Sequence, residues 1–135
     1  MVIILKKLKR FGVSGMTLYP IIFLRSKDLK HDIRIMNHER IHIRQQIEML
    51  VLPFYIIYLI EYLFGRLKYK SHFEAYLNIS FEREAFINHN NLKYLKVRNF
   101  WEWTRYIRIN NNFEIKELWI NARKAIKIKS TSEHD

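Results

Sequence analysis

The sequence predicts a mainly α-helical protein of the α+β class, with a short N-terminal β-strand or hairpin packed on a helix. Three observations lead to this prediction. Apolar residues recur with helical spacing over most of the chain after residue 33. One segment before that point, residues 17–25, is rich in β-branched and aromatic residues and follows two glycines. The 135 residues are 49% hydrophobic and 15% aromatic, which is enough apolar surface for one core.

Residues 17–25 predict an edge strand, because Pro20 is tolerated where a backbone N–H need not be donated to a neighbouring strand. Residues 26–28, Ser-Lys-Asp, predict a turn after it. Two uses of this strand stay open. Its free edge can bind an extended peptide by strand addition, or the strand can simply cover the helix that follows.

Residues 34–52 predict the helix around which the chain is organised. On a 3.6-residue wheel, one stripe carries Ile35, His38, His42, Gln45 and Met49, and a second stripe is wholly apolar. Pro53 is expected to end or kink this helix. Inward-facing histidines on such a helix need polar partners, because an unpaired buried polar group is costly. The remaining narrow polar face consists of Asn37, Arg40, Arg44 and Glu48.

This helix contains the pattern His-Glu-x-x-His, at His38, Glu39 and His42. Six histidines and ten glutamates in random order would produce the pattern about 0.02 times, so the match is informative. Residues four apart lie on one helix face, so both imidazoles can bind a single metal ion while Glu39 stands beside it as a catalytic base. A catalytic Zn²⁺ takes three protein ligands and keeps one position for water. Because the chain has no cysteine, the third ligand must be His, Asp or Glu.

Helical patterns continue towards the C-terminus, interrupted by glycine and asparagine residues. We expect one domain over residues 1–128, followed by a polar, disordered tail over residues 129–135. The helix after Pro53 is expected to stop at Gly65. The later helices are expected over residues 54–64, 71–90, 92–107 and 113–128.

Glu82 is the candidate for the third metal ligand. It lies forty residues after the motif, on the helix expected over residues 71–90. The small residues Ala75 and Ala85 would let this helix approach the first one closely. Glu84 points the opposite way on the same wheel and is expected to face solvent.

The segment Phe81-Glu82-Arg83-Glu84-Ala85 resembles the Glu-x-x-Ala signature that follows His-Glu-x-x-His in gluzincin metallopeptidases. Both motifs together, within about residues 17–106, are also similar to a group of small bacterial zincin-like proteins. The resemblance implies a minimal zincin-like domain with Zn²⁺ held by His38, His42 and Glu82. It also implies that Glu39 accepts a proton from water during hydrolysis of a peptide or protein substrate.

Larger gluzincins have an aspartate after the alanine, which often positions a histidine ligand, whereas this chain has Phe86. An imidazole ligand normally donates its second N–H to a carboxylate or carbonyl. Asn78, Glu74 and His89 are alternatives for that role. Tyr76 and His89 are candidates for stabilising negative charge that develops on a substrate.

The net charge of +11, with a pI near 10.0, predicts attraction to a polyanion or to an anionic membrane surface. The alternative to a hydrolase is therefore a non-catalytic basic binding protein with a structural metal site. Residues 98–108 interleave cations and aromatic residues, as nucleic-acid-binding segments do. The same pattern is more common in a helix with buried aromatics, so nucleic acid is the least favoured partner.

The apolar run over residues 49–60 is shorter than the about 20 residues that cross a bilayer. Its tyrosines, with Arg66, Lys68 and Lys70 nearby, suit a membrane interface. The chain starts with a short apolar run followed by lysines, which is the reverse of a secretory signal. We therefore expect a cytoplasmic protein, with peripheral attachment to the inner membrane as the alternative location.

Overall fold

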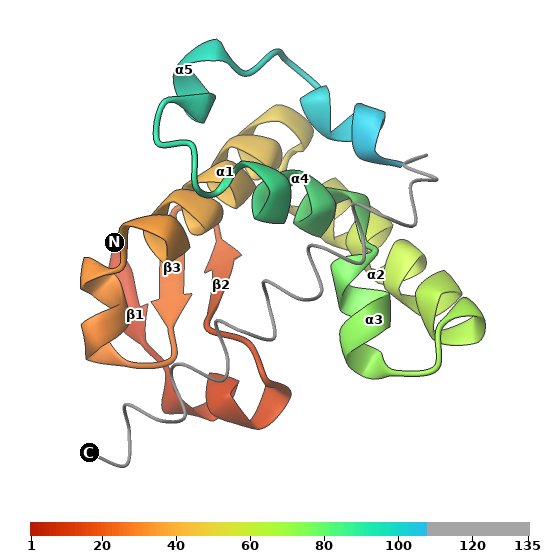
Figure 1. Cartoon of the computed structure of the whole chain (residues 1–135), viewed down its shortest axis with the longest axis horizontal. Coiled ribbons are helices and arrows are strands. Elements are labelled where there is room, and N and C mark those ends of the chain that lie inside the picture. The colour runs from red at the N-terminus through yellow and green to blue at the C-terminus, as the bar shows by residue number, and fades with distance from the viewer. Residues whose placement is uncertain (108–135) are drawn as a thin grey trace.

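The computed structural model describes residues 1–107 of the chain. This part is mainly α-helical with one small three-stranded sheet, which confirms the predicted α+β class. Figure 1 shows the sheet against helix α1, with α4 and α2 packed on other sides of the same helix. The helix predicted over residues 113–128 and the tail predicted over residues 129–135 lie outside the described residues.

The sheet contains β1 (Val2–Ile4), β2 (Gly15–Leu18) and β3 (Ile21–Leu24), in the order β1-β3-β2. Strand β2 pairs antiparallel with β3, and β1 pairs parallel with it. The single strand predicted over residues 17–25 is therefore most of a hairpin. Pro20, which cannot donate a backbone hydrogen bond, lies in the turn between the two strands. Strand β2, which contains Thr17, is at a sheet edge as predicted. The prediction is wrong for residues 21–24, because β3 is the central strand and pairs with β1 on one side and β2 on the other.

Two 3-10 helices connect these strands to the rest of the chain. Helix η1 (Lys6–Phe11) joins β1 to β2, and η2 (Lys27–His31) joins β3 to the first α-helix. Each contributes one buried leucine, Leu8 and Leu29 respectively. The turn predicted over residues 26–28 is thus the start of η2.

Helix α1 (Ile33–Met49) carries the His-Glu-x-x-His motif. Its N-terminus is capped by Asp32, whose Oδ1 accepts hydrogen bonds from two backbone N–H groups of the first turn, at 3.1 and 3.2 Å. The helix ends at Leu50, which has a positive φ of 67°. There the chain bends by 112° into helix α2 (Val51–Lys68).

Pro53 and Gly65 both lie inside α2. Pro53 is in the first turn, where a missing N–H leaves no helical hydrogen bond unmade, so the break precedes the proline. Gly65 does not stop the helix as predicted; it lets α2 approach Ala75, because an added Cβ would lie 3.1 Å from the Ala75 Cα. Within residues 1–107 no single helix is long and apolar enough to cross a membrane, although α1 and α2 meet those criteria as a bent pair.

The helix predicted over residues 71–90 is two helices, α3 (His72–Leu77) and α4 (Ser80–Asn88). Asn78 ends α3, and its Nδ2 donates a hydrogen bond to the Glu74 carbonyl at 2.7 Å. The next residue, Ile79, has an extended backbone, so the chain changes direction before α4. This change brings α4 against α1.

The continuous helix predicted over residues 92–107 is wrong for most of its length. The chain forms only α5 (Tyr94–Val97) and the 3-10 helix η3 (Glu102–Tyr106). Between them Arg98 has an extended backbone, and its guanidinium reaches buried carboxylates on α1 and α4. This long-range pairing competes with helix formation and is invisible to a local pattern.

Helix α1 is buried on two sides. A cluster that contains Ile22, Leu24 and Leu29 packs between the sheet and α1. A second cluster fills the space among α1, α2, α4 and η3. Its buried members are Met49, Phe54, Ile79, Phe81 and Trp103. The motif helix is therefore a central element, and its histidines face other protein rather than water.

Candidate metal centre

The structure brings together the three side chains that the sequence selected as metal ligands. His38 and His42 point from α1 and Glu82 points from α4. The Nε2 atom of His38 lies 3.0 Å from Glu82 Oε2, the Nε2 atom of His42 lies 3.2 Å from Glu82 Oε1, and the two Nε2 atoms are 3.1 Å apart. Ligand atoms in a tetrahedral zinc site are separated by about 3.3 Å. The donor set therefore fits one small divalent cation.

All three candidate ligand residues are buried, with exposures of 7% for His38, 5% for His42 and 4% for Glu82. Burial alone would lower the pKa of His42, but the charge and hydrogen bond of Glu82, together with the Glu39 charge and the Gln45 hydrogen bond, outweigh it and raise that pKa to about 9. Burial alone would raise the pKa of Glu82, but the two imidazoles hold it well below its usual range. Without a metal, His42 thus carries an extra proton and its positive charge balances the negative charge of Glu82.

The far side of the His42 ring is held by Gln45. Its Oε1 lies 2.8 Å from His42 Nδ1, so a hydrogen on Nδ1 leaves Nε2 free as a ligand. The Gln45 amide is held in turn, because its Nε2 donates to Glu84 Oε2 at 2.8 Å and to the Phe81 carbonyl at 3.2 Å. Gln45 is fully buried. Gln45 therefore orients the His42 ring, a role for which the sequence analysis named Asn78, Glu74 and His89.

Glu84 is also fully buried, so the prediction that it faces solvent is wrong. It accepts hydrogen bonds from the Tyr94 hydroxyl, at 2.8 Å, and from the Arg98 guanidinium. The same guanidinium pairs with Glu48 on α1. The helix wheel placed Glu84 correctly opposite Glu82, but the chain after α4 returns to cover that side.

Two residues of the predicted polar face of α1 are covered for the same reason. Asn37 was expected on the polar face of α1, yet it is 5% exposed. Its Nδ2 donates to the carbonyls of His89, at 2.8 Å, and Asn91, at 3.1 Å, beyond the C-terminus of α4. Glu48 accepts a hydrogen bond from Arg98, which lies in the loop between α5 and η3. These contacts tie α1 to the segment that follows α4.

The far side of the His38 ring meets His89 and Phe86. The two Nδ1 atoms of His38 and His89 are 3.4 Å apart, and the Phe86 ring lies edge-on at a centroid distance of 4.5 Å. Burial lowers the pKa of His89 to about 4. His89 is thus a neutral neighbour of His38, on the side of the ring that carries no ligand atom. It is not among the side chains whose ligand atoms converge in the described part of the chain.

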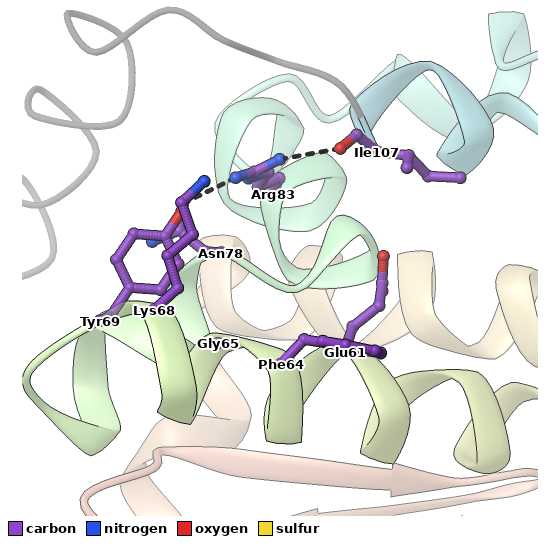
Figure 2. Close-up of a pocket in the computed structure, with 8 residues that line it drawn as sticks. All are labelled: Glu61, Phe64, Gly65, Lys68, Tyr69, Asn78, Arg83 and Ile107. Atoms are coloured by element: carbon purple, nitrogen blue, oxygen red, sulfur yellow. Dashed lines mark hydrogen bonds between the residues drawn. The ribbon is translucent and has the colours of Figure 1, made fainter.

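The other candidates for orienting the histidines make different contacts. Asn78 accepts a hydrogen bond from Arg83 at 2.7 Å and donates to the Glu74 backbone. Figure 2 shows Asn78 and Arg83 on the wall of a surface pocket between α2 and α4. Ile107 also lines this pocket. None of the three metal-ligand candidates lines that pocket.

Glu39 lies on α1 beside the triad and is 4% exposed. Its Oε2 accepts a hydrogen bond from the Thr17 hydroxyl on β2 at 2.6 Å. Gly15, on the same strand, leaves room for the carboxylate, because a Cβ there would lie 2.8 Å from Glu39 Oε1. Strand β2 therefore positions the carboxylate that the motif predicts as the base.

The outer edge of β2 is partly occupied by α1 and α2. Gln46 donates from Nε2 to the Thr17 carbonyl at 2.9 Å and accepts from the Tyr19 backbone N–H at 2.8 Å. The Tyr55 hydroxyl also donates to the Thr17 carbonyl. This part of the edge covers the motif helix, which is the second of the two uses left open by the sequence.

Tyrosines on α2 and α3 surround Glu82. The Tyr58 hydroxyl donates to Glu82 Oε1 at 3.0 Å. Burial and then the charge of Glu82 raise the pKa of Tyr76 well above its usual range, so its hydroxyl keeps its proton. Sequence reasoning named Tyr76 but missed Tyr58. The signal was present, because Phe54, Tyr58 and Gly65 share one face of α2.

No protein-family model matches the chain, and comparisons with curated proteins and with solved structures give no significant match. The class of the site therefore rests on its geometry. Two histidines four residues apart on one buried helix meet a glutamate from a second helix, with a further glutamate alongside. This arrangement is a candidate metal centre of the two-histidine, one-carboxylate type.

Proposed function

We propose that this protein is a zinc-dependent hydrolase of the gluzincin type, which cleaves amide bonds in a peptide or protein substrate. The observation that carries the proposal is the convergence of His38, His42 and Glu82 with Glu39 beside them. Two imidazoles and one carboxylate suit Zn²⁺. A hard cation such as Mg²⁺ prefers oxygen ligands alone.

When bound, Zn²⁺ would supply Lewis acidity towards a water molecule and a substrate carbonyl. Glu39 would accept the proton of the attacking water and pass it to the leaving amine. Thr17 holds one oxygen of that carboxylate, which restricts its rotation and leaves the other oxygen to act as the base. Tyr76, with its hydroxyl kept protonated, is the candidate donor to negative charge that develops on the substrate.

A second candidate function is a non-catalytic basic binding protein in which the metal only stabilises the fold. Burial of all three ligand side chains favours this alternative, because a structural site has no need of an entrance. Both candidates require the metal, so metal content cannot separate them. They differ on Glu39, which only the hydrolase needs as a base.

The metal site is tested by elemental analysis of the purified full-length protein. We expect about one equivalent of zinc in the wild type and loss of that zinc in His38→Ala and Glu82→Ala. A control variant, Glu102→Gln, alters a carboxylate on η3 that pairs with exposed Arg105 and should retain the metal. Stoichiometric zinc in Glu82→Ala would show that the ligand assignment is wrong.

The hydrolase is tested with Glu39→Gln, which keeps the shape of the side chain and removes its basicity. We expect this variant to retain zinc and to lose cleavage of a peptide library, with new termini detected by mass spectrometry. Glu102→Gln should cleave as the wild type does. If the zinc-loaded wild type cleaves nothing, the structural alternative takes the place of the hydrolase.

A further inference from the structure

Helix α2 carries an exposed apolar strip along one side. Its members, which lie between 47% and 86% exposed, recur at helical spacing along the whole helix. At 100° per residue they cover about 100° of the helix circumference without a polar residue among them. The strip consists of Leu52, Ile56, Leu59, Ile60, Leu63 and Leu67.

The opposite face of α2 is already used by the core. Phe54 and Gly65 are buried, and Tyr58 donates its hydrogen bond to Glu82. The tyrosines that the sequence analysis assigned to a membrane interface are on this inner side. The strip is thus a second, separate apolar face, and exposed apolar surface of this extent marks an interaction site.

The exposed charges on α2 and directly after it have one sign. The only acid of α2, Glu61, turns away from the strip towards α4, where its Oε2 accepts hydrogen bonds from the Ser80 hydroxyl at 2.7 Å and backbone N–H at 3.2 Å. Figure 2 shows Glu61 on the pocket side of the helix. Exposed cations follow the C-terminal end of the strip, at Arg66, Lys68 and Lys70.

We propose that α2 docks this protein on an anionic phospholipid membrane, lying flat in the interface with its apolar strip among the acyl chains. A helix with an outward apolar strip and flanking cations has the composition of an interfacial helix. Long basic side chains can bury their stems beside the strip and keep their charges near lipid phosphates. The net charge of +11 adds a long-range attraction to the same surface.

A second copy of the chain fits this surface less well. It would bring the same strip and the same cations, and α2 offers no exposed acid to pair with Arg66 or Lys70. The docked orientation has a further consequence. Because Tyr58 on the inner face of α2 contacts Glu82, the candidate metal centre would lie about one helix diameter, roughly 10 Å, from the membrane surface.

The test is flotation of the full-length protein with vesicles of phosphatidylglycerol and phosphatidylcholine, and with phosphatidylcholine alone. We expect the wild type to float with the anionic vesicles. The double variant Leu59→Glu/Leu63→Glu should lower that partitioning by at least about tenfold. The charge-matched control Ile33→Glu/Val97→Glu changes two equally exposed apolar residues outside α2 and should float more strongly than the strip variant.

Circular dichroism and zinc content, compared among the three proteins, separate loss of docking from loss of fold. Absence of flotation with anionic vesicles, or equal flotation of both double variants, would overturn the proposal. The chain has no cysteine, so Leu63→Cys carries a single photo-crosslinker. Crosslinking to lipid supports docking on a membrane. Crosslinking to a second copy, or to residues 108–135 of the same chain, assigns the strip to that occupant and refutes docking on a membrane.

Discussion

Three buried glutamates lie in or near the candidate metal centre, and their partners decide which of them is free to bind a cation. Glu84 is neutralised by Arg98 and receives the Tyr94 hydroxyl. Glu39 is held by the Thr17 hydroxyl. Glu82 faces two imidazoles, and its other partners are the neutral hydroxyls of Tyr58 and Tyr76. A buried carboxylate needs a partner, and Glu82 is the one of the three whose partners include two further candidate metal ligands.

Gln45 acts as a positioning residue for His42. Replacing it in Gln45→Leu removes the acceptor for His42 Nδ1, so the ring can rotate or carry its hydrogen on the ligand nitrogen. We expect the zinc affinity to fall by about 10–100-fold. The measurement is competition with a chromophoric chelator, made on protein whose fold is checked by circular dichroism.

The matched control is Gln46→Leu. Gln46 is also buried, and its replacement removes one hydrogen bond to β2 and one to the turn after it, but no contact with a candidate metal ligand. Both variants should be less stable than the wild type, but only Gln45→Leu should bind zinc more weakly. Equal zinc affinities in the two variants would remove the positioning role of Gln45.

Arg98 holds two buried carboxylates, Glu84 and Glu48, with a side chain that is only 1% exposed. Its replacement in Arg98→Leu leaves both charges without their cation. We expect a loss of about 3–5 kcal/mol in the free energy of unfolding, measured by urea denaturation. Arg105→Leu breaks an exposed ion pair with Glu102 and should cost less than about 1 kcal/mol. Similar losses in both would contradict this account.

At the scale of single elements, Gly65 lets α2 approach α3 closely at Ala75. An added methyl group in Gly65→Ala would lie 3.1 Å from the Ala75 Cα and Cβ. Helix propensity alone would favour alanine by about 1 kcal/mol. We expect overpacking to win, with a net loss of about 1–3 kcal/mol in the free energy of unfolding.

A double-mutant cycle checks the origin of this loss. Ala75→Gly removes the atom that the new methyl group meets, so Gly65→Ala should be less damaging in that background. The free energies of unfolding of the two single variants and the double variant provide the coupling. Additive losses would show that the contact between α2 and α3 is not the cause.

The sequence predicted best those elements whose local residue pattern agrees with the contacts that they make in the folded protein. Helix α1 was expected over residues 34–52 and spans Ile33–Met49, because its apolar stripes, its cap and its motif all agree. The helix predicted over residues 92–107 failed because Arg98 leaves the helix to reach Glu84 and Glu48. A local sequence pattern cannot reveal a partner that lies fifty residues away, as Glu48 does from Arg98.

The same limit separates the site residues that could be predicted from those that could not. His38, His42 and Glu82 could be selected from spacing and from a family resemblance, and the structure brings them together. Gln45 and Glu84 could not, since the wheel gives a direction for each side chain but not what covers it. Glu84 was placed in solvent because nothing in α4 itself predicts that Tyr94 will lie over it.

At the scale of the whole molecule, the candidate metal centre joins two halves of the chain. His38 and His42 belong to α1, which packs on the N-terminal sheet, and Glu82 belongs to α4. A bound cation would link them at a point where the metal-free protein has only a protonated imidazole against a carboxylate. Metal binding should therefore be coupled to the stability of the whole fold.

We expect zinc to raise the free energy of unfolding by about 2.7 kcal/mol when the free metal is one hundred times its dissociation constant. Because a ligand stabilises only the state that binds it, the increase should grow with the logarithm of the free zinc concentration. Thermal unfolding in zinc buffers, followed by circular dichroism, measures this dependence. Glu82→Ala removes one ligand while leaving both imidazoles, so its midpoint should be nearly independent of zinc. A zinc-dependent rise of the same size in Glu82→Ala would mean that the cation binds elsewhere and that α1 and α4 are not linked through it.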